Sequence, residues 1–214
     1  SALEYSNIGN TFFYKQSIDS AICYETEALR RADSINSNSI YSRVYMNMGL
    51  INKQLGNYSK AIEYFEMAYF IRRDSLLLYD DCSAPIGEMA GIYIDTHDYE
   101  SAKQILSLYL GDDAIQITEG QASIVWNQLA QVYYKMGNLD SAAAIARQSL
   151  QYAKDQGNVM LVTDNYKLLD SIFLAKRDFR MAAMQCREFI SICDTVFNEA
   201  IADQLVKIRY SSKY

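Results

Sequence analysis

A short pattern of aromatic, apolar and small residues returns five times along this chain, each time inside a segment with helical periodicity. Its most regular position is held by Gly9, Gly49, Ala90, Ala130 and Asp170, at intervals of 40, 41, 40 and 40 residues. A fixed repeat of about 20–50 residues is the signature of a solenoid, in which each unit buries its apolar face against its neighbours. The spacing therefore predicts a stack of helical hairpins, an architecture that usually presents a binding surface.

Each copy has an internal order that predicts two helices separated by a turn. In the second copy, Gly49 lies in the first helix, Gly56-Asn57 interrupts the pattern, and Ala61, Phe65 and Ala68 follow at helical spacing. Glycine and asparagine tolerate the left-handed conformation that ends helices, so the first helix is predicted to end there. The small residue lets the second helix approach closely, because added methylenes at such a contact cost about 1–3 kcal/mol.

The fourth copy, with Trp126, Leu129-Ala130 and Tyr133, resembles the W-x2-L-G-x2-Y pattern of the tetratricopeptide repeat. Five registered copies extend this resemblance over most of the chain. It implies an all-α fold, a right-handed α-α superhelix of five helical hairpins plus a C-terminal helix. The predicted repeats, within a repeat region of residues 1–195, cover residues 2–36, 39–76, 82–111, 119–157 and 159–195. Residues 196–214 are predicted to form a capping or linker helix.

The charge balance excludes some classes of partner. The chain carries 20 basic and 26 acidic residues, a net charge of −6. Non-specific binding to nucleic acid or to an anionic membrane depends on a basic surface that neutralises phosphates, so we expect no direct nucleic-acid binding by this region. No apolar run approaches the roughly 20 residues that cross a bilayer, so no membrane insertion is expected.

The sequence offers little for catalysis, and it predicts no enzyme, no cofactor and no metal site. His97 is the one histidine, so a metal site with two histidines cannot form within one chain. Its place in Thr96-His97-Asp98, just before the second helix of the third copy, predicts an exposed or capping turn residue. Phosphate-binding, dinucleotide-binding and nucleophile-elbow motifs are absent from the sequence. The 4 cysteines form no C-x2-C pair and are interpreted as small buried hydrophobic residues.

Polar residues flank the small position of the first helices, and the tetratricopeptide resemblance places this face in a concave groove. An amide both donates and accepts hydrogen bonds, so a line of amides suits the backbone of an extended peptide. The alternative is an ordinary polar surface, because exposed helix faces are polar in any case. The predicted peptide- or protein-binding groove comprises Asn7, Asn10, Arg43, Asn47, Asn127, Gln131, Lys135, Asp164 and Lys167.

One subtype of groove can be tested on the sequence. Asn10 and Asn47 match the two asparagines of the carboxylate clamp with which chaperone-binding tetratricopeptide domains hold a peptide C-terminus. The lysine positions of that clamp hold Ser6 and Ala84, however, and its arginine position holds Glu88. Because no cation offsets the desolvation of a carboxylate, binding of chaperone tails is not expected.

The C-terminal stretch carries a second resemblance. Residues 189–199 run into residues 204–210 in an order similar to the junction in Bacteroidetes-type regulators, where a repeat array is followed by a membrane span and then a kinase or DNA-binding module. Ile201, Leu205 and Ile208 are spaced as on one face of a helix. Such a helix would cap the last repeat, form a homodimer contact, or do both.

Together, the two resemblances imply a non-catalytic sensing region of a bacterial signalling protein, either a membrane-anchored transcriptional regulator or a sensor kinase. The array would lie on the periplasmic face and bind a peptide or protein, and binding would change its curvature or dimer contacts. Two alternatives stay open. One is a freestanding scaffold for protein assembly, and the other is a cytoplasmic peptide-pheromone receptor, a class that also uses lengthened repeats.

Overall fold

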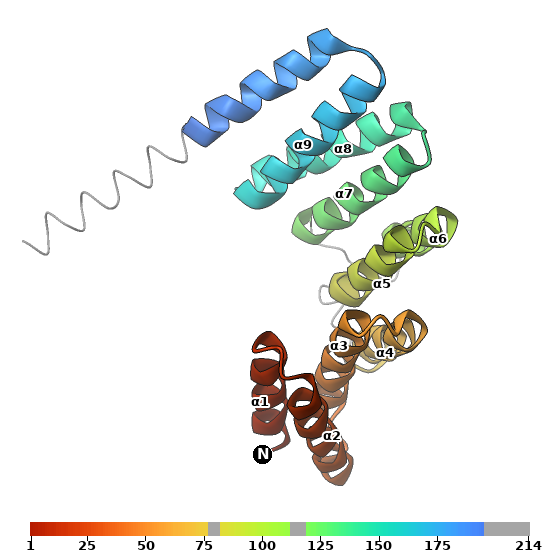
Figure 1. The fold of residues 1–214 in the computed structure, drawn as a ribbon, viewed down its shortest axis with the longest axis vertical. Coiled ribbons are helices and arrows are strands. Elements are labelled where there is room, and N and C mark those ends of the chain that lie inside the picture. Colours follow the sequence, from red (N-terminus) through yellow and green to blue (C-terminus); the bar gives the residue numbers. More distant parts are fainter. Residues whose placement is uncertain (77–81, 112–118, 195–214) are drawn as a thin grey trace, which may run out of the picture.

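The computed structural model describes residues 1–76, 82–111 and 119–194, and within these ranges the chain forms helices joined by short turns, with no strand (Figure 1). The helices pair into five hairpins: α1 (Ala2–Tyr14) with α2 (Ile18–Ile35), α3 (Asn38–Gln54) with α4 (Tyr58–Phe70), α5 (Ser83–Asp95) with α6 (Tyr99–Leu110), α7 (Glu119–Lys135) with α8 (Leu139–Asp155), and α9 (Val159–Ala175) with the helix of residues 179–194. A short π-helix, η1 (Ile71–Ser75), continues α4. The predicted all-α solenoid is confirmed, and the predicted terminal helix of residues 196–214 lies outside the described residues.

All five hairpins turn in the same way. The central turn residue has a positive φ in each, 75° at Gly56, 79° at Gly137, 60° at Gln16, 65° at His97 and 59° at Arg177. The N–H of the following residue donates to a carbonyl five positions back, at 2.8–2.9 Å, which is the bond that closes a helix C-terminus. The predicted helix ends at Gly56 and Gly137 are therefore confirmed. Non-glycine residues adopt the same left-handed conformation in the other three turns, although it costs them about 1–2 kcal/mol.

The small residue of the first helix faces the residue sixteen positions later, in the second helix. A Cβ atom built on Gly49 would lie 2.6 Å from Cδ1 of Phe65, and one built on Gly9 would lie 2.8 Å from Oε1 of Glu25. Real Cβ atoms do not approach other atoms so closely, so the close approach predicted at Gly49 is confirmed. The side chains of Glu25 and Phe65 are both fully buried.

The buried core changes in character along the array. One apolar cluster joins α4 to α7 and includes Phe65, Met89 and Leu106. A second joins α7 to the helix of residues 179–194 and includes Tyr166 and Leu169. On α1 and α2 the buried side chains are instead small or polar: Ala2, Ala21, Ala28, Ala32, Ser6 and Glu25.

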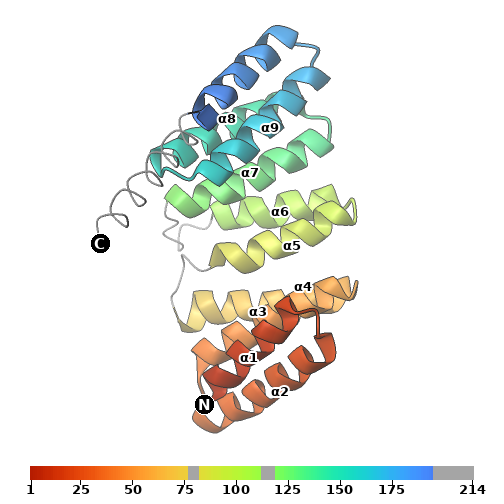
Figure 2. The same cartoon turned by 60° about the vertical axis from the view of Figure 1, so that its left-hand side comes forward.

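The first helices form the inner face of the stack. Across neighbouring hairpins α1 packs on α3, α5 on α7 and α7 on α9, whereas no two of the second helices α2, α4, α6 and α8 pack to a comparable extent. Elements on the inside of a curved array lie closer together, which identifies this face as the inner one (Figures 1 and 2). The first helices α3 and α5 pack less closely than the other neighbouring pairs, so the stack is widest between the second and third hairpins.

Candidate functional site

The N-terminal part of the predicted groove lies on α1 and α3. Asn7 and Arg43 are both exposed, and Nη1 of Arg43 donates to Oδ1 of Asn7 at 3.4 Å across the two helices. Asn10, one turn along α1, is half-buried. The structure therefore brings Asn7 and Arg43 together at the surface, where both present polar atoms to solvent.

Asn47 is committed to a contact inside the protein. Its Nδ2 atom donates to Oε1 of Glu25 at 2.7 Å and to Oγ of Ser6 at 3.2 Å, and the Ser6 hydroxyl donates to the same carboxylate oxygen at 3.3 Å. The three side chains come from α3, α2 and α1, so the network joins the first hairpin to the second. An amide that sequence reasoning assigned to ligand binding thus also holds the array together.

The Glu25 carboxyl is the ionisable centre of this network. Burial raises the pKa of Glu25 to about 7, while the hydrogen bonds from Asn47 and Ser6 and the charge of Arg43 lower it. Desolvation dominates because a buried carboxylate loses the water that stabilises its charge. Sequence reasoning missed Glu25, although its distance from Gly9 matches that of Phe65 from Gly49 and could have identified it.

A polar pocket of about 200 Å³ opens beside this network on α3. Arg43 and Asn47 line it, and Nε of Arg72, from η1, donates to Oγ of Ser42 at 2.8 Å within it. The remaining lining residues are Ser39, Met46 and Leu76. Two guanidinium groups, an amide and two hydroxyls thus surround a hollow whose lining contains no carboxylate.

The second half of the predicted groove contains another internal network. Nδ2 of Asn127 donates to Oδ1 of Asn165 at 3.0 Å, and Nε2 of Gln131 donates to Oδ1 of Asn127 at 2.6 Å. Asn165 in turn donates to Oγ of Ser149 at 2.9 Å, and Ser149 donates to the carbonyl of Ser123 at 2.6 Å. Asn127 is buried and Gln131 is half-buried, so these amides crosslink α7, α8 and α9.

The charged members of the predicted groove remain at the surface. Lys135 at the end of α7 is exposed. On α9, Nζ of Lys167 lies 4.0 Å from Oδ1 of Asp164, with the two side chains 67% and 45% exposed. Exposed pairs of this kind contribute about 0–1 kcal/mol to stability, so these charges can meet a partner at little cost.

Polar side chains also bridge the first helices in the middle of the array. Nζ of Lys53 on α3 lies 2.8 Å from Oε2 of Glu88 on α5, and Nε2 of Gln128 on α7 donates to the Gly87 carbonyl at 3.2 Å. Glu88 occupies the position at which a carboxylate clamp would hold its arginine. It is paired with Lys53, and the position therefore carries a neutralised acid.

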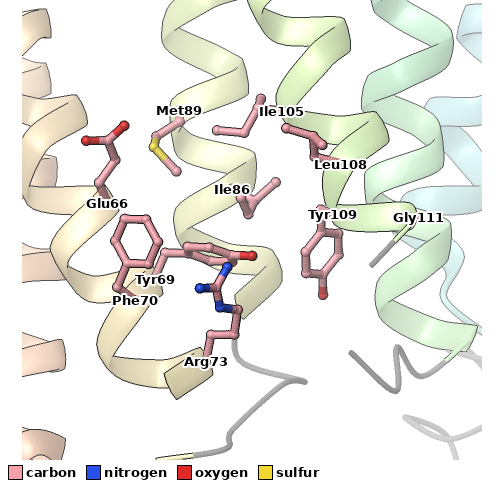
Figure 3. A pocket seen from close by; sticks show the side chains of 10 residues that line it. All are labelled: Glu66, Tyr69, Phe70, Arg73, Ile86, Met89, Ile105, Leu108, Tyr109 and Gly111. Atoms are coloured by element: carbon pink, nitrogen blue, oxygen red, sulfur yellow. The ribbon is translucent and has the colours of Figure 1, made fainter. Parts of the chain in front are cut away.

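An apolar cleft of about 380 Å³ opens between the second and third hairpins (Figure 3). Its apolar walls come from α4, α5 and α6: Tyr69, Phe70, Ile86, Met89, Ile105, Leu108 and Tyr109. Arg73 lies over the Tyr69 and Phe70 rings, 5.3 and 5.2 Å from their centroids, and donates to Asp74 at 2.6 Å. Sequence reasoning did not identify this cleft, because its walls are residues that normally complete a repeat core.

His97 lies where the sequence predicts, exposed in the turn between α5 and α6, with Nδ1 3.1 Å from the carbonyl oxygen of Asp95. Across the described ranges, no three or more His, Cys, Asp and Glu side chains are grouped as a metal would require. In the same ranges, no helix is both long and apolar enough to cross a membrane.

The interpretation of all four cysteines as buried is wrong for three of them. Cys82 is buried, whereas Cys23, Cys186 and Cys193 are exposed. In α2 the buried positions include Ala21 and Glu25, and Cys23 falls midway between them on the opposite side of the helix. Cys186 and Cys193 lie on the helix of residues 179–194, which is the last helix of the described part of the stack.

Comparisons with known proteins agree with this architecture. The tetratricopeptide repeat family model matches residues 42–73 and 124–156. Comparison with curated protein sequences gives no significant match.

Solved structures of similar fold cover most of the chain. The crystal structure of BtubC from P. vanneervenii superposes with a TM-score of 0.77 and 19% identity, over 90% of this chain and 79% of that one. The apo form of RapI gives a TM-score of 0.78 and 15% identity, over 94% and 73%. A signal transduction ATPase with numerous domains and a tetratricopeptide repeat sensor, from Pyrococcus horikoshii, gives 0.76 and 16%, over 90% of this chain and 30% of that one. At these identities the likeness establishes the fold alone.

Proposed function

Because this chain is a tetratricopeptide-repeat protein, and such arrays are protein-interaction scaffolds, we propose that it is the non-catalytic sensing region of a bacterial signalling protein. In this proposal a peptide or protein partner binds along the inner face formed by the first helices. The parent protein would be a membrane-anchored transcriptional regulator or sensor kinase, with the array on the periplasmic side.

The observation that carries the proposal is the polar pocket beside Arg43 and Asn47. Arg43 is exposed and makes no ion pair with any residue in the described parts of the chain, so its charge is directed at solvent and at Asn7. Guanidinium N–H groups donate to carbonyl and carboxylate oxygens in fixed directions. A peptide backbone lying across α1 and α3 would find donors from Arg43 and Asn7, and acceptors from the hydroxyls of the pocket.

The structure also limits which groove residues can serve a partner. The side-chain amides of Asn47 and Asn127 donate to Glu25 and Asn165, so we assign both residues a structural role in the inner face. Recognition then rests on the exposed members Asn7, Arg43 and Lys135, together with the Asp164 and Lys167 pair.

Two observations support the signalling part of the proposal. A protein of similar fold is described as a signal transduction ATPase with a tetratricopeptide repeat sensor. The sequence after residue 189 is similar to the junction that precedes a membrane span in Bacteroidetes-type regulators. Self-association through residues 196–214 is part of the same proposal and concerns residues outside the described ranges.

The test compares inner-face and outer-face cations against one partner, captured with this chain as bait and then purified. We expect Arg43→Gln to weaken binding about 5- to 150-fold, because a charged hydrogen bond to a partner contributes roughly 1–3 kcal/mol. Lys60→Gln, an exposed cation on the second helix α4, is the matched control and should leave the dissociation constant unchanged. Equal affinities for both variants, measured by calorimetry, would place the binding site away from the inner face.

A further inference from the structure

Glu25 takes a position that apolar residues hold in the next hairpins. The corresponding side chains, sixteen residues after the small position, are Phe65 and Leu106, and all three are fully buried. A carboxyl in such a site is unusual, because buried acids are rare unless they are paired. Glu25 is not fully paired, since its Oε2 atom is buried and accepts no hydrogen bond.

The groups that face Glu25 come from both helices packed against it. From α1 the facing polar group is the Ser6 hydroxyl. From α3 they are the Asn47 amide, 2.7 Å from Oε1, and the Arg43 guanidinium, which acts on Glu25 through its charge. Both direct hydrogen bonds reach the same oxygen, and Arg43 is exposed, so solvent screens much of its charge. The carboxylate is therefore incompletely compensated.

We propose that docking of the first hairpin onto the second is linked to the protonation of Glu25: the contact between α1, α2 and α3 is tight when the carboxyl is neutral and loosens when it ionises. A neutral carboxyl has no charge to desolvate, and it keeps both hydrogen bonds at Oε1. An ionised carboxyl leaves a charged oxygen, Oε2, without a donor. Separation of α2 from α3 would admit water to that oxygen.

The sign of the linkage follows from the two protonation constants. Burial raises the pKa of Glu25 from the ordinary 4.5 to about 7, so the docked state, in which the carboxyl is buried, binds the proton more tightly than an open state in which water reaches it. Docking is strongest below pH 4.5, weakens as the pH rises from 4.5 through 7, and is level above about pH 8.

The protonation of Glu25 can affect the inner face, because the contact between the first hairpin and α3 that buries Glu25 also positions inner-face residues. Asn7 lies on α1 and Arg43 on α3, 3.4 Å apart through their polar atoms, and Asn47 lines the polar pocket while it binds Glu25. Loosening α1 and α2 from α3 would separate Asn7 from Arg43. This inference goes beyond the proposed function and stands without any partner.

Hydrogen exchange of the 214-residue chain tests the proposal without a ligand. Protection factors, corrected for intrinsic exchange, are measured at pH 6 and pH 8 for amides of α1, α2 and α8. We expect those of α1 and α2 to fall about tenfold over this range, and those of α8 to stay constant. In Glu25→Gln the fall should disappear, whereas Glu63→Gln, an exposed carboxyl on α4, should behave as the parent.

A tenfold fall that persists in Glu25→Gln, or none in the parent, would overturn the proposal. A direct titration guards against a variant that does not fold: the carboxyl carbon of Glu25, followed by NMR in the parent, should titrate near pH 7. A midpoint between pH 4 and 5 would also overturn it. Since neither measurement uses a partner, their failure would leave the proposed function standing.

Discussion

The first two hairpins differ at one equivalent buried position, sixteen residues after the glycine of the first helix. The first hairpin has a carboxyl there and the second has an aromatic ring. In the second, Gly49 faces the Phe65 ring, and that ring belongs to an apolar cluster that continues through α7. In the first, Gly9 faces the Glu25 carboxyl, which is hydrogen-bonded to Ser6 and Asn47. An aromatic ring contributes through area and packing, and its contribution does not depend on pH. A buried carboxyl contributes through directed hydrogen bonds, and its contribution depends on whether it is protonated. The stability of the first hairpin contact can therefore depend on pH, whereas that of the Phe65 contact does not.

The two positions also contribute differently: Phe65 contributes mainly to stability, and Glu25 contributes to the specific arrangement of the helices around it. Burial of Phe65 stabilises whatever apolar neighbours it has, because the hydrophobic effect is not directional. The hydrogen bonds of the Glu25 network form only when α1, α2 and α3 meet in one arrangement. The network between α7 and α9 is built in the same way from Asn127 and Asn165, but without an ionisable group.

The largest loss of stability is expected when the aromatic ring at this position, Phe65, is removed. Phe65→Ala should lower the free energy of unfolding by about 3–5 kcal/mol, since it removes a fully buried ring and leaves a cavity. Urea denaturation followed by circular dichroism measures the loss. Met67→Ala on the same helix, where the side chain is 45% exposed, is the control and should cost far less. A loss below about 1 kcal/mol for Phe65→Ala would mean that the buried ring contributes little to the stability of the array.

The two amide networks should differ in their pH dependence. Asn127→Ala and Asn47→Ala should each cost about 1–3 kcal/mol, because each removes a hydrogen bond that a buried side chain, Asn165 or Glu25, accepts. The Asn47 hydrogen bond lowers the pKa of Glu25, so removal of this bond raises that pKa further. The variant therefore loses more stability at a pH at which the carboxyl is ionised. The loss for Asn47→Ala should therefore be larger at pH 8 than at pH 5, by about 1 kcal/mol.

The loss for Asn127→Ala should be the same at both pH values, because the groups bonded to Asn127 are amides and do not titrate. Denaturant melts at pH 5 and pH 8 measure both variants. A loss that depends on pH to the same degree in both would contradict the assignment of the proton to Glu25.

The smallest effect compares the two glycines. Gly49→Ala should cost about 1–2 kcal/mol, since its Cβ would meet the rigid Phe65 ring and overpack the contact. Gly9→Ala should cost less, because its Cβ meets the Glu25 carboxyl, which can shift at the expense of its hydrogen bonds, and alanine gains up to about 1 kcal/mol of helix propensity. Thermal melts of the two variants at pH 6 rank them, and a larger loss at Gly9 would reverse the comparison.

Much of the fold could be predicted from the sequence, because a repeat states the same local rule several times. The interval between Gly9, Gly49 and Ala90 predicts the hairpins, and Gly56 and Gly137 lie at the helix ends where the pattern predicts them. The groove was harder to predict. Helical spacing places Asn47 and Asn127 on the right helices, but it does not say whether their donors meet solvent or another helix.

The sequence by itself determined the period, the pairing of helices and the helix ends at Gly56 and Gly137, since these depend on backbone geometry and on residues close together in the chain. Only the tertiary structure decided what lies opposite each side chain. It buried Glu25 where composition suggests an exposed acid, exposed Cys23 where composition suggests a buried thiol, and bonded Asn47 to Glu25. Burial and hydrogen bonding between hairpins depend on residues some twenty to forty positions apart, and their free energies arise only when the helices have packed.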